Sequence, residues 1–424
     1  MYVRRVKLSN IRSIRELDWG ISLRGSAGWH VVIGDNGSGK STFLRAIALA
    51  LVGPSEAIAL RQDWNDWLSR GESQGSITLW LKSNSFLDRF AGRGRTPDSL
   101  PGFALRLSRQ NGEVDLKGSR LQGKNNPDKH VWSGRAGWFS VAYGPFRRFT
   151  GGDRDYEKIF YSNPRLAAHL SVFGENVALT ECLEWLRQLN YKKLERRPEG
   201  QLLDRVKAFV NQEGFLPHHA RLHEISSEGV EFVDGNGCQL PVEELSDGYR
   251  SILSMTFELI RQLTVTYESW RIFDAEDPSK IIAPGVVLID EVDAHLHPTW
   301  QRKIGPWFRE HFPNLQFIVT THSPFICQAA DVGTVFRLPK PGSVEPAQMI
   351  TGDELSRLLY GNVLDAYSTE MFGQDTSRSD ESKKKLQRLA ELNRKELTEG
   401  LSKAEEKEQE NLRAALPSSA HKVA

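Results

Sequence analysis

The sequence predicts an α/β protein with a mixed sheet core, and three segments support this fold class. Residues 29–51 contain a compact apolar strand, a glycine-rich loop and an apolar helix in that order, which is half of a β-α-β unit. Residues 286–289 and 317–320 are two more short apolar runs, and the first ends at a pair of acidic residues. Unbroken apolar strands are typical of parallel sheets buried on both faces. We therefore expect the second and third strands to lie side by side.

The remaining segments divide the chain around this core. Two short strands are expected in residues 1–24, and residues 76–150 are β-rich by alternation. Residues 165–215 have the apolar spacing of helices and predict an inserted helical lobe. After residue 374 the chain is heavily charged with sparse leucines, which favours a solvated, partly disordered helical tail over a partner-binding helix. The expected units are an N-terminal lobe with a β subdomain (1–160), a helical insertion (161–225), a C-terminal lobe (226–345) and a charged, partly disordered helical tail (346–424).

Composition excludes several classes of protein. The chain has 424 residues, a net charge of +1 and 26% charged residues, so no whole-protein basic field drives nucleic-acid binding, although a local basic patch remains open. Its three cysteines are far apart, which argues against a disulfide scaffold or a zinc motif. The apolar runs are too short for a bilayer and the start lacks a signal-peptide core. We expect a cytoplasmic protein without a membrane partner.

A phosphate-binding loop is the strongest motif. The segment "GDNGSGKST", residues 34–42, fits G-x-x-x-x-G-K-[ST] at every position, between a predicted strand and a predicted helix. Its glycines let backbone N–H groups turn toward an anion, the lysine supplies a cation for the β- and γ-phosphates, and the serine supplies a hydroxyl for Mg²⁺. The chain is therefore predicted to be a P-loop NTPase that binds ATP and Mg²⁺. The candidate nucleotide-binding residues are Gly34, Asn36, Gly37, Ser38, Gly39, Lys40, Ser41 and Thr42.

Two strand ends supply candidate catalytic residues. Asp290 and Glu291 follow the apolar run "VVLI", where side chains face the ligand crevice of a parallel sheet. Asp290 is expected to hold Mg²⁺ together with Ser41, and Glu291 to act as the general base that polarises the attacking water. His322 ends the neighbouring strand. We expect it to contact the γ-phosphate or the attacking water.

The histidine clusters favour no metal site. His295 and His297 form an H-x-H pair beside Asp293, but a turn that contacts a neighbouring subunit is the preferred interpretation. The segment "PHHARLH" at 217–223 matches no standard ligand set, and metal binding is rejected there.

The segment "LSDGYRS", residues 245–251, precedes the apolar run of a helix. Local capping by Ser246 or Asp247 explains it in one way. Reception of a phosphate from another molecule at the helix start explains it in another. The segment itself leaves both open.

The order of these motifs resembles ABC-type ATPases of the branch that contains SMC, RecF and OLD-like proteins, and "LSNIRSIRELDW" near the start is also similar to that branch. The resemblance implies an ABC ATPase head, in which ATP lies between the Walker A loop of one subunit and the signature of another, so that ATP joins two copies. It assigns Walker A to Gly34–Thr42, the signature to Leu245–Tyr249, Walker B to Asp290 and Glu291, the start of the D-loop to Asp293 and the switch histidine to His322. It also places Arg12 near the nucleotide's base or α-phosphate, and Ser246 and Gly248 at the phosphate of the second copy.

The chain departs from the family pattern at two places. Asp247 and Tyr249 replace the first glycine and the glutamine of LSGGQ. A carboxylate close to a γ-phosphate is unfavourable unless it turns away to cap its own helix, which we expect of Asp247. No convincing Q-loop glutamine is found, and Arg147 or Arg148 is the candidate to sense nucleotide there.

Within this branch the chain resembles stand-alone ATPases of anti-phage systems such as Septu in the form "LSDGYRS", in the segment "DEVDAHLHPTWQ" and in a short tail after "THSPF". The D-x-D pair that an OLD-type nuclease domain would add is not found after His322. This similarity implies a separate nuclease partner of the HNH type and a process that involves DNA. Three alternatives remain open: a DNA-repair or SMC-like ATPase, the nucleotide-binding subunit of a membrane transporter, and an ATP switch with slow turnover.

Overall fold

The computed structural model describes residues 1–22, 25–84, 87–89, 99–120, 127–133, 137–149, 162–174, 179–362 and 380–416. The chain divides into two compact units, Met1–Gly361 and Asn362–Ala424. The boundary expected after residue 345 lies inside the first unit, because β14 (Gln348–Ile350) pairs with β13 (Gly333–Arg337). Parts of the expected tail, residues 363–379 and 417–424, lie outside the described residues.

A six-stranded mixed sheet forms the centre of the first unit, which confirms the predicted mixed sheet core. Its order is β14-β13-β3-β12-β11-β7, and all neighbours are parallel except the β13–β14 pair. Strands β3, β11 and β12 are buried at every residue, as their apolar sequences require. The bounds are Gly28–Ile33 for β3, Gly285–Ile289 for β11, Leu315–Thr320 for β12 and Ser140–Tyr143 for β7.

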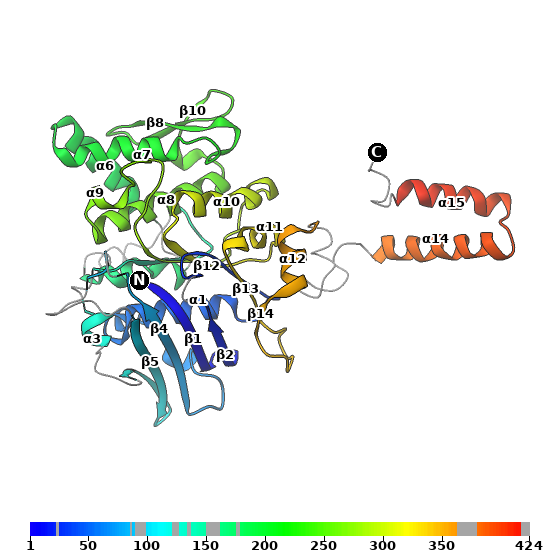
Figure 1. Cartoon of the computed structure of the whole chain (residues 1–424), viewed down its shortest axis with the longest axis horizontal. Helices are drawn as coiled ribbons and strands as arrows, with labels where there is room; N and C mark the ends of the chain where they lie inside the picture. Colours follow the sequence, from blue (N-terminus) through cyan, green and yellow to red (C-terminus); the bar gives the residue numbers. More distant parts are fainter. Residues whose placement is uncertain are drawn as a thin grey trace. The chain divides into compact units, whose positions relative to one another are not determined.

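Helix α1 (Lys40–Val52) lies between this sheet and a five-stranded antiparallel sheet (Figure 1). Only Ser41 and Arg45 of the helix are not buried, because apolar side chains of both sheets join the same core around it. The second sheet has the order β2-β1-β4-β5-β6. Its strands are β1 (Tyr2–Ile11), β2 (Ile14–Gly20), β4 (Gln74–Lys82), β5 (Ser99–Gln110) and β6 (Glu113–Arg120).

A helical lobe and a small sheet occupy the top of the view in Figure 1. Helices α6 (Glu181–Leu194) and α7 (Gln201–Val210) bury one apolar face each, next to a three-stranded sheet of order β10-β9-β8. The strands are β8 (Arg221–Ile225), β9 (Val230–Val233) and β10 (Gln239–Pro241). Two longer helices, α8 (Asp247–Thr266) and α10 (Pro298–His311), follow in the chain. The shorter helices are α2 (Pro54–Ala57), α3 (Pro127–His130), α5 (Pro164–Ala167), α9 (Ser269–Ile272), α11 (Pro324–Cys327) and α12 (Gly352–Tyr360).

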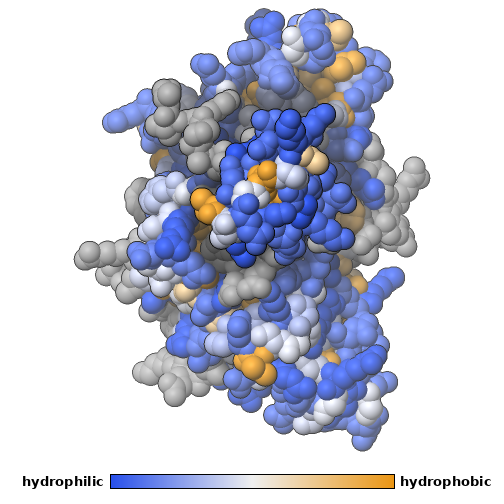
Figure 2. All heavy atoms as spheres, turned by 90° about the vertical axis from the view of Figure 1, so that its right-hand side faces the viewer, coloured by the Kyte–Doolittle hydropathy of each residue, from blue (hydrophilic) through white to orange (hydrophobic). Residues whose placement is uncertain are grey.

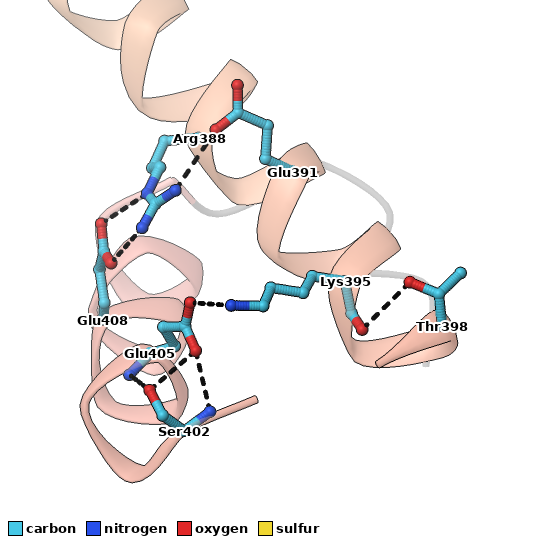
Figure 3. Close-up of polar contacts among 7 residues, drawn as sticks. All are labelled: Arg388, Glu391, Lys395, Thr398, Ser402, Glu405 and Glu408. Atoms are coloured by element: carbon cyan, nitrogen blue, oxygen red, sulfur yellow. Dashed lines mark hydrogen bonds and ion pairs between the residues drawn. The ribbon is translucent and has the colours of Figure 1, made fainter. Parts of the chain in front are cut away.

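The second unit contains the helices α14 (Asp380–Thr398) and α15 (Lys403–Ala415). Ion pairs connect them: Arg388 with Glu408 at 3.0 Å, and Lys395 with Glu405 at 2.6 Å (Figure 3). Ser402 and Glu405 form a capping box at the start of α15, which satisfies two N–H groups of the helix end.

The face of the molecule drawn in Figure 2 is mostly hydrophilic, with small separate apolar patches.

Among the described helices, none is by itself long and apolar enough to cross a bilayer, and one sharply bent pair, Lys40–Val52 with Pro54–Leu60, passes that test jointly.

Candidate functional site

The phosphate loop connects β3 to α1, at the edge where the parallel strands end. Gly39 is the N-cap of α1 in a left-handed conformation with φ 99°. A Cβ at Gly39 would lie 3.0 Å from Ile14, beside Ser13, so the β1–β2 turn packs against the loop. At Gly34 a Cβ would lie 2.6 Å from the Ser38 hydroxyl. Both positions therefore require glycine for close packing.

The loop presents donors that fit an anion. The Ser38 hydroxyl is buried and has no hydrogen-bond partner among the residues that the structure describes. Lys40 donates from Nζ to the carbonyl oxygens of Gly34 and Asp35, at 2.8 and 3.0 Å. The first turn of α1 contains no acidic residue, so its N-terminal N–H groups and dipole favour a negative ligand. Of the remaining loop residues, Asn36 is exposed, Thr42 is buried and Ser41 lies between these extremes.

Charges of the acidic strand end act on this loop. Burial lowers the pKa of Lys40, and the carboxylates of Glu291 and Asp290 oppose this effect. Asp290 is buried and accepts a hydrogen bond of 2.6 Å from the Thr320 hydroxyl. The same hydroxyl accepts the backbone N–H of Glu291 at 2.8 Å. The structure thus brings β11, β12 and the phosphate loop into one polar site.

The end of β12 carries a second set of contacts. The Thr321 hydroxyl donates to Asp293 at 2.5 Å, and Ser323 donates to the side chain of Gln301 at 2.6 Å. His322 is exposed between them. Desolvation within the site and the charge of Lys40 lower the pKa of His322, which favours the neutral imidazole.

Arg12 lies in the turn that packs against the loop. Its backbone N–H donates to the Trp67 carbonyl at 2.9 Å, and its guanidinium lies 4.7 Å above the Trp67 ring. Burial and the neighbouring charge of Arg45 lower the pKa of Arg12. The side-chain Nε is buried without a hydrogen-bond partner among the described residues.

Arg147 has a different surrounding from the one expected of a nucleotide sensor. It is 4% exposed, and it donates four hydrogen bonds within the chain, to Ser251, Gly144, Asp290 and Glu291. A guanidinium has five N–H groups, so little remains for a direct contact with nucleotide. This network was not predictable from the sequence. The contacts of Thr320 and Thr321 had a signal, because "TTHS" ends the strand that was expected to lie beside the strand before "DEVD".

The start of α8 lines a cavity that includes no residue of the phosphate loop. Ser246 is the N-cap, is exposed and makes no side-chain capping bond. Asp247 does not cap the helix as expected: it is the first helical residue, and its carboxylate pairs with Arg250. A Cβ at Gly248 would lie 2.9 Å from the His295 carbonyl oxygen, so this glycine is also required by packing within the chain.

The cavity beside α8 has a volume of about 1250 Å³ and includes Ser246 and Gly248 but none of residues 34–42. His218, His219, His295 and His297 also line it. Among the residues that the structure describes, no group of three or more His, Cys, Asp or Glu side chains is arranged to hold a metal ion.

Two family models match parts of the chain. The model described as "AAA domain, putative AbiEii toxin, Type IV TA system" matches residues 151–328, and one described as "AAA domain" matches residues 5–197. A solved SMC head bound to the C-terminal winged-helix domain of ScpA has a TM-score of 0.50 at 18% identity, and the match covers 84% of this chain and 100% of that one. This likeness concerns the fold.

Two relatives share longer or closer stretches of sequence. The chain is 27% identical over 331 residues to the Septu protein PtuA of Bacillus mycoides (strain KBAB4), a match that covers 76% of this chain and 38% of that protein. It is 37% identical over 124 residues to the Retron Ec83 probable ATPase of Escherichia coli, which covers 29% of this chain and 22% of that protein. The chain therefore matches less than two thirds of either relative's length. In fold the chain resembles an SMC head, and in sequence it resembles PtuA and matches two AAA-domain models.

Proposed function

We propose that this chain binds and hydrolyses ATP with Mg²⁺, and that ATP joins two copies which gate a separate effector. The observation that carries the hydrolysis part is that two carboxylates from a distant part of the chain act on the ammonium group of Lys40. The charges of Glu291 and Asp290 act on its ammonium, although these residues are about 250 positions apart in the chain, so the acid pair and the phosphate loop share one site.

Each residue has a defined task in this proposal. Lys40, now bonded to two loop carbonyls, is free to exchange them for phosphate oxygens, and the buried Ser38 hydroxyl gains a partner. Ser41 and Asp290 would hold Mg²⁺, which when bound neutralises charge on the β- and γ-phosphates. Glu291 accepts the proton of the attacking water. His322, whose neutral form is favoured, donates or accepts a hydrogen bond at the same edge.

The start of α8 supports the dimeric part of the proposal. Ser246 is exposed and its side chain makes no capping hydrogen bond, and its cavity contains no residue of the chain's own phosphate loop. A helix start with free N–H groups is suited to an anion, and we assign that anion to the nucleotide of a second copy. The names of the relatives, Septu PtuA and a retron ATPase, support a role in anti-phage defence, with a nuclease partner and DNA as the components to test.

Glu291→Gln tests the hydrolytic assignment. It keeps the side chain's size but removes the base, so we expect phosphate release to fall by at least about 100-fold while ATP binding persists and the dimer accumulates with ATP. Lys40→Ala is expected to lose nucleotide binding. Phosphate release and light scattering with ATP measure both effects, and the exposed Glu345→Gln is the matched control. Full turnover in Glu291→Gln would reject the assignment of Glu291 as the base. If the unmodified protein formed an ATP-dependent dimer but released no phosphate, it would be an ATP switch.

Ser246→Arg tests the second copy's contact. A long cation at the helix start blocks access to the cavity but lies outside the chain's own phosphate loop. We expect ATP binding to the monomer within about twofold of the wild type, no ATP-dependent dimer and a turnover reduced by at least about 100-fold. Equilibrium binding of a fluorescent ATP analogue and sizing separate the two properties. Loss of binding by the monomer would instead assign this segment to local capping alone.

A further inference from the structure

Glu291 has a strained backbone that two side chains hold in place. Its φ is 47°, in the left-handed region that residues with a Cβ rarely adopt. The Thr320 hydroxyl accepts its N–H at 2.8 Å, and the Arg147 guanidinium donates to its carbonyl oxygen at 3.1 Å. Strained conformations persist only where the surroundings determine them. The direction of the Glu291 side chain therefore depends on both contacts.

Arg147 links Glu291 to the helix that begins at the signature. Its Nε donates to the Ser251 hydroxyl at 2.9 Å, and Nη1 donates to the carbonyl oxygens of Gly144 and Asp290 at 3.0 and 2.9 Å. Ser251 lies in α8 and is 1% exposed. One guanidinium thus connects β7, β11 and α8.

The cation is retained at a cost in solvation. Burial lowers the pKa of Arg147 to about 10, and Asp290, Asp293 and Glu291 oppose this effect, so the group stays charged at neutral pH. Its hydrogen-bond partners are carbonyl and hydroxyl oxygens. An apolar side chain would fill the same space without the desolvation penalty. What it would not supply is a rigid, directional connection between three elements.

We propose that Arg147 is a positioning residue that couples the signature helix α8 to the catalytic base Glu291 of the same chain. Displacement of α8, when Ser246 engages the nucleotide of a second copy, passes through Ser251 and the guanidinium to the Glu291 carbonyl. Each head thereby sets its own base according to engagement with its partner. This inference rests on the proposed function, and it adds a connection between the two nucleotide sites of a dimer.

Ser251→Ala tests the connection because it removes only the link to α8 and leaves the three carbonyl contacts of Arg147. Ser254→Ala is the matched control: it lies in the same helix, is also buried, and within the described residues its hydroxyl donates to the Ser251 carbonyl. We expect Ser251→Ala to lower kcat about tenfold, the effect of about one hydrogen bond to a charged group, with KM and ATP-dependent dimerisation unchanged. Arg147→Lys keeps the charge but loses the fork of donors, and its kcat should fall further.

Hydrogen exchange gives a second readout that needs no nucleotide. The amides of residues 290–294 should exchange about tenfold faster in Ser251→Ala than in Ser254→Ala, because local opening follows the lost contact. Equal exchange and equal kcat in the two variants would overturn the coupling while leaving the proposed function standing. Absence of wild-type turnover or dimerisation would reject the proposed function, and the exchange rates would still decide the link.

Discussion

Helix α1 and the C-terminal hairpin of α14 and α15 are stabilised by opposite means. Apolar side chains of two sheets enclose α1, whose helix start forms the phosphate loop. The hairpin buries Leu392 and Gln409, and exposed ion pairs and a capping box connect its helices (Figure 3). Close-packed cores fix positions to within small distances, whereas exposed ion pairs contribute little and respond to salt. The two regions should therefore fail under different conditions.

Removal of a core side chain beside α1 should have the largest effect. Phe43 is fully buried and packs edge-on against Trp19 at 6.1 Å, so Phe43→Ala should lower the free energy of unfolding by about 3–5 kcal/mol. Tryptophan fluorescence in urea measures this in the first unit alone, because all 11 tryptophans precede residue 362. The exposed Val265→Ala is the control, expected within about 0.5 kcal/mol of wild type. If Phe43→Ala and Val265→Ala unfolded at the same urea concentration, the stability of the first unit would not depend on burial around α1.

Acid should separate the two units. Burial lowers the pKa of His30 and of His169 to about 4, so both are neutral in the folded chain while the unfolded chain protonates them below about pH 6.5. The unfolded state then binds more protons, and the first unit loses stability as pH falls from about 6.5 to 4, by up to about 3 kcal/mol per histidine. His169→Gln should reduce this slope.

The hairpin should respond at lower pH. The hydrogen bond from Lys395 lowers the pKa of Glu405 to about 2. The contribution of this contact to the stability of the hairpin is therefore present above about pH 4.5 and is lost as pH falls through 2. Circular dichroism against tryptophan fluorescence from pH 7 to 2 checks the order of the two transitions. A hairpin that melts before the first unit would reverse the comparison.

The smallest effect is expected from a hairpin arginine. Arg388→Ala removes the bonds to Glu408 and Glu391, and should reduce helical content slightly at low salt and not at high salt, since salt screens exposed pairs. Arg394→Ala, in the same helix and without an ion pair among the described residues, is the control. The fluorescence transition of the first unit should not move in either variant, and a shift there would show that the units are coupled.

The parts of the site that the sequence predicted are contiguous motifs. Residues 34–42 and the Asp290–Glu291 pair each combine their chemistry with an adjacent strand, and local spacing is enough to place them at one sheet edge. The links through Arg147 were not predictable, because Arg147 and Ser251 are 104 positions apart and Arg147 and Glu291 are 144 apart. The exchange of capping for an ion pair at Asp247 depends on the rotamer of Arg250, which no sequence pattern determines.

The stacking of Arg12 on Trp67 has a practical consequence. An indole that faces a guanidinium changes its emission when the cation moves away, and Arg12 is the one residue of the predicted nucleotide set that makes such a stack within the described structure. Binding of a nucleotide that recruits Arg12 would therefore be visible without any label, as a spectral change that Trp67→Phe abolishes. Emission from Trp67 would then allow nucleotide entry to be timed separately from turnover.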